Sequence, residues 1–279
     1  NHHGLNPDEV LIELKPREGE NNLRTEDILT AISEAGDELA LVLLSGVQYY
    51  TGQFFDIPTI TKAGHDQGAK VGWDLAHAMG NLPLKLHDWD VDFATWCSYK
   101  YLNSGPGNVS GIFVHERFAN DKSIQRFAGW WGYNEDTRFQ MTKGFDPMPG
   151  ADGWQTSNVN VLSSAAHLAS LEIFDEVGMD ALRAKSLKLT AYLEFLIKEL
   201  SGEDNIFEVI TPANPAERGC QLSILFHQNG RALFDELTNQ GVIADWREPN
   251  VIRVAPVPLY NRFEDVFQFV RILKEAINS

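Results

Sequence analysis

Residues 70–100, KVGWDLAHAMGNLPLKLHDWDVDFATWCSYK, hold the pattern that decides the fold class. Apolar, β-rich runs at 70–74 and 90–97 predict two strands on either side of a polar, proline-containing stretch. Upstream, LALVLL at 39–44 predicts a buried strand, and an amphipathic helix is predicted at 57–68, between this strand and residue 70. This strand–helix–strand order predicts an α/β fold with a mainly parallel sheet.

The patterns on either side of this stretch divide the chain into two parts. Residues 23–36 predict another amphipathic helix and residues 110–115 another strand, so helices and strands alternate in the first half. From about residue 160, two long helical patterns are followed by short strands and helices, which is typical of a small α+β domain. In this part we predict helices at 160–177, 179–200, 231–240 and 262–277, and strands at 207–211, 219–226 and 251–255.

Composition excludes several classes of protein. With 43% hydrophobic and 22% charged residues the chain of 279 residues is typical of a globular protein, and its net charge of −16 repels nucleic acids and anionic lipids. We therefore expect neither a nucleic-acid partner nor a membrane partner. Two cysteines, Cys97 and Cys220, cannot form a disulfide framework, which favours a reducing, cytoplasmic location. The first residues include no initiator Met and no signal peptide, so we expect a fragment or a processed product.

Three side chains that could take part in catalysis or cofactor binding follow predicted strands. Asp74 ends one strand, His77 lies in the loop after it, and Lys100 follows the next strand beside a glycine-containing loop. Ligands of open α/β sheets bind beyond the carboxyl ends of the strands. A capping Asp or a surface Lys would be the ordinary interpretation of either residue alone. Together they indicate pyridoxal 5'-phosphate, whose enzymes need a carboxylate at the pyridine nitrogen and a lysine that forms a Schiff base.

Longer motifs point to one family. They are the segments SGVQYYTGQFFDIPTITKAGH (45–65), GWDLAHAMGNLPLKLHDWDVDFATWCSYKYLNSGPG (72–107) and IRVAPVPLYN (252–261), with further motifs at 15–20, 129–139, 157–162, 170–174 and 210–222. In these segments the sequence resembles the kynureninases, which are pyridoxal phosphate-dependent hydrolases of fold type I, related to class V aminotransferases. The resemblance implies that residues 1–160 are the C-terminal part of a large cofactor-binding domain and that residues 161–279 form a small C-terminal α+β domain.

The resemblance implies roles for residues around the cofactor. Lys100 would bind the cofactor and move protons, Asp74 would bond the pyridine nitrogen, and His77 would pack beside the ring. Ser45 and Tyr99 would contact the cofactor, and Tyr99 would also act as a catalytic proton donor or relay. A tyrosine buried in the core is an equally weighted interpretation of Tyr99.

Further residues are implied to bind substrate or to act across subunits. Arg253 would hold the substrate α-carboxylate through a bidentate pair. Trp130 and Asn158 would reach the cofactor phosphate of a neighbouring subunit, which implies a homodimer with shared active sites. Ser157 and Asn158 would contact the substrate ring and favour the 3-hydroxy substrate.

The implied reaction is hydrolysis of L-kynurenine or L-3-hydroxykynurenine to L-alanine and an anthranilate, in tryptophan catabolism and NAD biosynthesis. Relatives carry an upstream segment with further cofactor contacts, so we expect an N-terminally truncated chain that binds the cofactor weakly or not at all. Two alternatives stay open: a cysteine desulfurase-like lyase, although neither cysteine suits a catalytic loop, and an inert form that pairs with a full-length subunit. No metal site is expected, and His2 and His3 are more typical of a solvated end.

Overall fold

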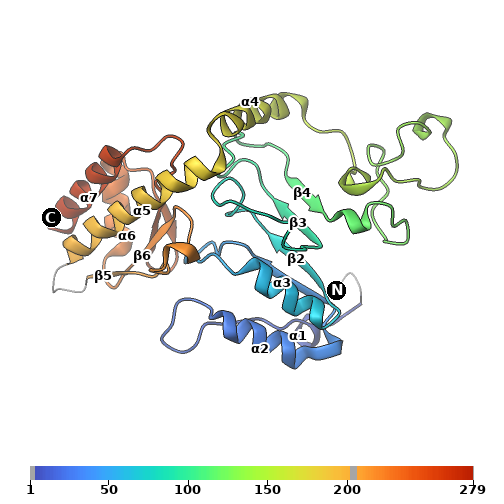
Figure 1. Cartoon of the computed structure of the whole chain (residues 1–279). Helices are drawn as coiled ribbons and strands as arrows, with labels where there is room; N and C mark the ends of the chain where they lie inside the picture. The colour runs from blue at the N-terminus through green and yellow to red at the C-terminus, as the bar shows by residue number, and fades with distance from the viewer. Residues whose placement is uncertain (1–3, 202–205, 279) are drawn as a thin grey trace.

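The computed structural model describes residues 4–201 and 206–278, so His2 and His3 lie outside it. It contains two four-stranded sheets, here called the first and the second sheet (Figure 1). The first half contains α1 (Pro7–Val10), α2 (Thr25–Ala35), β1 (Leu41–Ser45), α3 (Ile57–Asp66), β2 (Lys70–Asp74), β3 (Phe93–Trp96) and β4 (Gly111–Val114). The second half contains α4 (Val161–Val177), α5 (Met179–Ser201), β5 (Phe207–Val209), β6 (Leu222–Phe226), α6 (Gly230–Asn239), β7 (Asp245–Arg247), β8 (Val251–Val254) and α7 (Phe263–Ile277).

The first sheet confirms the predicted parallel order for three of its strands. Its order is β1-β2-β3-β4, with β1, β2 and β3 parallel and β4 antiparallel. The strand β4 reverses because β3 is joined to it by a loop, without the crossover helix that a parallel neighbour requires. Ser45 lies opposite Asp74, and Asp74 lies opposite Thr95, so the carboxyl ends of the parallel strands share one edge.

Helices α2 and α3 lie side by side and cover one face of the first sheet (Figure 1). Alternate residues of a strand point to opposite faces, so Val42 packs in the core whereas Leu41 and Leu43 are 45% and 57% exposed on the other face. The core between helices and sheet includes Ile28, Ile57, Ile60, Val71 and Trp73, all fully buried.

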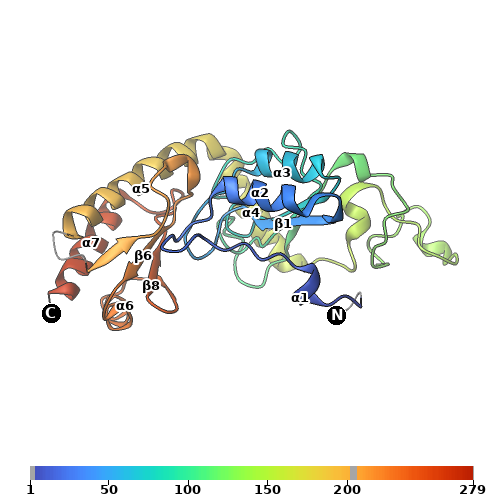
Figure 2. The same cartoon turned by 90° about the horizontal axis from the view of Figure 1, so that it is seen from below.

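The second sheet has the order β5-β6-β8-β7 and is antiparallel throughout. The predicted helices and the strands β5, β6 and β8 are confirmed, with small shifts at their ends. The strand β7 was not predicted, because three residues with two charges carry no strand pattern, and its pairing with β8 imposes the extended conformation. The second sheet and its helices occupy one end of the molecule, and residues 119–160 extend at the other (Figure 2).

Across residues 4–201 and 206–278, every helix is too short or too polar to cross a lipid bilayer. The predicted domain boundary near residue 160 stays a prediction.

Candidate active site

Lys100 lies in a loop that follows β3 at the carboxyl edge of the first sheet. Two buried serines close this loop: the Ser104 hydroxyl donates to the Ser98 hydroxyl at 2.9 Å, and Ser98 donates to the Val109 carbonyl at 2.5 Å. The preceding loop packs tightly against it, since a Cβ on Gly80 would lie only 2.9 Å from the backbone of Tyr101. Lys100 is therefore carried by a loop that hydrogen bonds within the loop and tight packing hold in place.

The amine of Lys100 contacts an imidazole. Its Nζ lies 3.1 Å from Nε2 of His77. Burial, followed by the positive charge of Lys100, lowers the pKa of His77 to about 4, so this imidazole is neutral near neutral pH and accepts from the ammonium. Within the described part of the chain, Nδ1 of His77 is buried without a hydrogen-bond partner. Such an atom is a candidate contact for a bound group.

Arg253 faces the same space from β8 of the second sheet. Its side chain is only 9% exposed, it pairs with Asp245 of the neighbouring strand, and it donates to the Tyr49 carbonyl. Asp245 also pairs with Arg247 at 2.9 Å. A cavity of about 500 Å³ brings these groups together, and its lining is His77, Lys100, Tyr101, Gln221, Asp245, Arg247, Arg253, Ala255, Val257 and Tyr260.

Three of the predicted site residues thus line one cavity: Lys100, His77 and Arg253. Asp74 and Ser45 lie in register at the same sheet edge, but neither belongs to the lining. One carboxylate oxygen of Asp74 accepts from the Ala76 amide at 2.8 Å, so this residue also caps its own loop.

The other predicted residues lie away from this cavity. Tyr99 is 50% exposed, so the alternative of a tyrosine buried in the core is wrong. Trp130 is 44% exposed, and Ser157 and Asn158 are exposed at the end of the 119–160 segment. None of these four residues lines the cavity of its own chain, and their roles stay predictions.

Several lining residues were missed by the sequence interpretation. Tyr101 is partly buried, and desolvation raises its pKa well above the usual value. It lies directly after Lys100, so its place in the sequence could have predicted that it lies near the site. Asp245 and Arg247 carried no signal, because a short charged segment is typical of a surface loop. Only the pairing of β7 with β8 brings them to Arg253.

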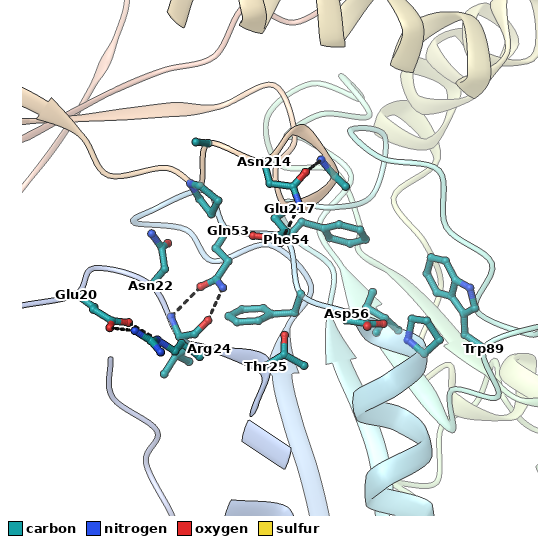
Figure 3. A pocket seen from close by; sticks show the side chains of 17 residues that line it. Glu20, Asn22, Arg24, Thr25, Gln53, Phe54, Asp56, Trp89, Asn214 and Glu217 are labelled. Atoms are coloured by element: carbon teal, nitrogen blue, oxygen red, sulfur yellow. Dashed lines mark hydrogen bonds and ion pairs between the residues drawn. The ribbon is translucent and has the colours of Figure 1, made fainter. Parts of the chain in front are cut away.

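A second, larger cavity of about 690 Å³ holds none of the predicted residues (Figure 3). Its polar side chains are largely engaged: the Gln53 amide bonds to both backbone groups of Leu23, and Arg24 pairs with Glu20. Figure 3 shows these bonds along one wall, with Trp89 and Asp56 farther along. Among the described residues, no group of three or more His, Cys, Asp or Glu side chains could hold a metal ion.

The sequence comparisons match the chain to kynureninases. Residues 182–273 match the family model described as the kynureninase C-terminal domain. The chain is 62% identical to a kynureninase of Flavobacterium johnsoniae over 99% of its own length, and 51% identical to one of Nematostella vectensis. It spans 65% of the length of the first of these relatives and 62% of the second.

Solved structures resemble the chain in fold. A cysteine desulfurase from Escherichia coli has a TM-score of 0.76 at 16% identity, with 93% of this chain and 64% of that one covered. A C-DES mutant with glycine covalently linked to its PLP cofactor has a TM-score of 0.74 at 19% identity, with 92% and 66% covered. At such identities the likeness concerns the fold alone.

Proposed function

The chain belongs to the kynureninase family, and from this premise we propose that it hydrolyses L-kynurenine or L-3-hydroxykynurenine to L-alanine and anthranilate or 3-hydroxyanthranilate. One observation carries the proposal: a lysine amine, a neutral imidazole and a nearly buried arginine line a single cavity. An amino-acid substrate needs such a combination, because its carboxylate requires a cation and its Cα requires a base.

We propose pyridoxal 5'-phosphate as the cofactor. The side chains at this edge fit it: Lys100 offers an amine, Asp74 a carboxylate, Ser45 a hydroxyl, and His77 a buried ring nitrogen that has no partner among residues 4–201 and 206–278. When bound, the cofactor supplies an electron-poor ring that accepts the electrons left by bond cleavage at the substrate.

The residues of the chain have separate tasks in this proposal. Arg253 binds and orients the substrate carboxylate, because Asp245 and the Tyr49 carbonyl hold its guanidinium in place. Lys100 holds the cofactor, and its Nζ, when free, serves as the base that moves the proton of the substrate Cα. His77 remains neutral and accepts from that amine, so it keeps the lysine aimed into the cavity without adding a charge.

We further propose a cytoplasmic homodimer with shared active sites that acts in tryptophan catabolism and NAD biosynthesis. Trp130, Ser157 and Asn158 would complete the site of the partner, whereas Tyr99 would contact the cofactor bound by Lys100 of its own chain. Support comes from the position of the first three on the extended 119–160 segment, outside the cavity of their own chain, with Trp130 substantially exposed.

A cysteine desulfurase-like lyase is less well supported. Such an enzyme needs a reactive thiolate, and burial raises the pKa of Cys220 to about 12. Cys97 lies directly after β3, where its thiol is 4.0 Å from the Ala76 carbonyl.

The proposal is tested by incubating the protein and pyridoxal phosphate with each kynurenine and measuring alanine and the anthranilate by mass spectrometry. Lys100→Ala should abolish both products, whereas Lys85→Ala, a change of an exposed lysine, should leave them unchanged. Product formation by Lys100→Ala at the wild-type rate, or its absence in the wild type, would contradict the proposal.

A further inference from the structure

Three consecutive main-chain carbonyls of the first half, those of residues 49–51, accept side-chain hydrogen bonds from the second half. We call them the carbonyl row. The first accepts from Gln221 Nε2 at 3.2 Å and from the Arg253 guanidinium. The second accepts from the Ser223 hydroxyl at 2.6 Å, and the third from the Thr211 hydroxyl at 2.5 Å. Each carbonyl thus has a separate donor in or beside the second sheet.

The loop that carries the carbonyl row is itself held in one conformation. The Gln48 side chain accepts from the amides of Tyr50 and Thr51, and the Gln48 carbonyl accepts from the Gly52 amide at 2.8 Å. Gly52 has φ +80°, a backbone conformation that residues with a Cβ rarely adopt. The row therefore presents its acceptors as a fixed set.

The donors are buried at this junction. Thr211 is 4% exposed, Ser223 is not exposed, and Gln221 is 3% exposed. The Thr211 hydroxyl also accepts from the Ser223 amide at 2.8 Å, so one hydroxyl bridges the second sheet and the loop. Removing it would leave a buried amide and a buried carbonyl without partners, which is costlier than losing an exposed hydrogen bond.

The same junction determines where Arg253 lies. Ser223 of β6 is directly opposite Arg253 of β8, and residues opposite each other in an antiparallel pair point to the same face. Both side chains therefore reach the carbonyl row, one at Tyr50 and the other at Tyr49. Lys100, in contrast, is carried by the first sheet. The separation of the arginine from the lysine depends on this contact between the two halves.

We propose that Thr211 and Ser223 are positioning residues that hold Arg253 at its working distance from Lys100. This rests on the proposed function, in which Arg253 binds the substrate carboxylate. Neither hydroxyl lines the cavity, so both act through the carbonyl row and not on the substrate.

The test compares Thr211→Val, which keeps the side-chain shape but removes the hydroxyl, with Thr211→Ser, which keeps the hydroxyl. In the cofactor-loaded protein we expect Thr211→Val to raise KM for kynurenine roughly fivefold to tenfold with kcat changed less than about twofold. Thr211→Ser should retain the wild-type KM. Ser223→Ala should behave like Thr211→Val.

Thr190→Val is the matched control. Thr190 is 1% exposed, and in the described part of the chain its hydroxyl donates to carbonyls of α5 alone, so the change disturbs a buried threonine without touching the junction. It should lower the thermal midpoint but leave KM unchanged. Equal KM values for Thr211→Val and the wild type, or an equal rise in Thr211→Ser or Thr190→Val, would overturn the positioning role.

Two readouts separate this inference from the proposed reaction. The first is the dissociation constant for L-alanine, a small carboxylate, which Thr211→Val should raise as it raises KM. The second is hydrogen exchange at the Phe54 amide, which donates across the junction to the Glu217 carbonyl at 2.8 Å. Exchange there should be faster in Thr211→Val and not in Thr190→Val. If the wild type does not hydrolyse kynurenine, the reaction fails, and unchanged alanine binding in Thr211→Val would still refute the positioning role.

Discussion

The first sheet has titratable side chains at its carboxyl edge, where the parallel strands end, and at its amino edge, where they begin. The two edges differ in whether these side chains have hydrogen-bond partners. At the carboxyl edge, Lys100 and His77 line a cavity, and one ring nitrogen of His77 is buried without a partner among the described residues. At the amino edge, Asp92 is 3% exposed and fully bonded: it accepts from the Val71 amide at 2.7 Å, from His65 at 2.9 Å and from Arg117 at 2.6 Å.

This difference separates function from stability. A buried group that lacks a partner beside a cavity can exchange contacts with a ligand, whereas a buried group with every bond made resists exchange. The carboxyl edge should therefore respond to mutation mainly in catalysis. The amino edge should respond mainly in the free energy of unfolding.

The largest expected effect on stability comes from the amino edge. Asp92→Asn should lower the free energy of unfolding by about 3 kcal/mol, because it leaves the Arg117 and His65 side chains without their buried carboxylate. Urea unfolding measures this loss, and KM should not move. Asp88→Asn, whose carboxylate is 71% exposed, is the control and should have little effect. A change in KM with unchanged stability would reverse the assignment of the two edges.

The next effect concerns catalysis at the carboxyl-edge cavity. Arg253→Lys keeps the charge but loses the planar fork that contacts Asp245 and the Tyr49 carbonyl, so kcat/KM should fall about thirtyfold. Arg271→Lys, on the exposed face of α7, is the matched control and should retain activity. Steady-state kinetics of both variants measure kcat/KM. If kcat/KM of Arg253→Lys is close to that of Arg271→Lys, Arg253 does not bind the substrate.

Local patterns were sufficient for much of the fold and for part of the site. The apolar runs predicted all four strands of the first sheet, and the position of Lys100 just after a strand end was visible without coordinates. These features are local, since strand periodicity and the residues that follow a strand are adjacent in the chain. The sheet is mainly parallel, as predicted, and β4 is antiparallel because its connection to β3 lacks a helix.

The partners of Arg253 were beyond local patterns. Tyr49 is separated from Arg253 by 204 residues, and only the contact between the two halves makes its carbonyl an acceptor. Asp245 is close in sequence, but its role depends on a strand of three residues that pairing alone defines. Such contacts are properties of tertiary structure, and no spacing rule in a single sequence contains them.

The last expected effect is a difference in acid sensitivity between the two edges. Burial first, and then the charge of Lys100, lower the pKa of His77 from 6.5 to about 4. Between these two pH values the unfolded chain binds a proton at His77 and the folded protein does not. The contribution of His77 to the free energy of unfolding is therefore fully present above pH 6.5 and is lost as the pH drops toward about 4. Burial opposes the ionised form of Asp92, but the hydrogen bonds from Val71, His65 and Arg117 outweigh it and lower its pKa below 3.8. Its contribution is present above 3.8 and is lost only as the pH falls further, through the folded pKa.

Urea midpoints measured across the acid range separate these two contributions. His77→Asn should flatten the pH dependence between 6.5 and about 4, whereas Asp92→Asn should keep that slope and flatten the dependence below 3.8. His227→Asn, at an exposed position, should follow the wild type throughout. If His77→Asn and His227→Asn have the same slope, His77 does not lose its proton on folding, and the neutral imidazole proposed beside Lys100 is wrong.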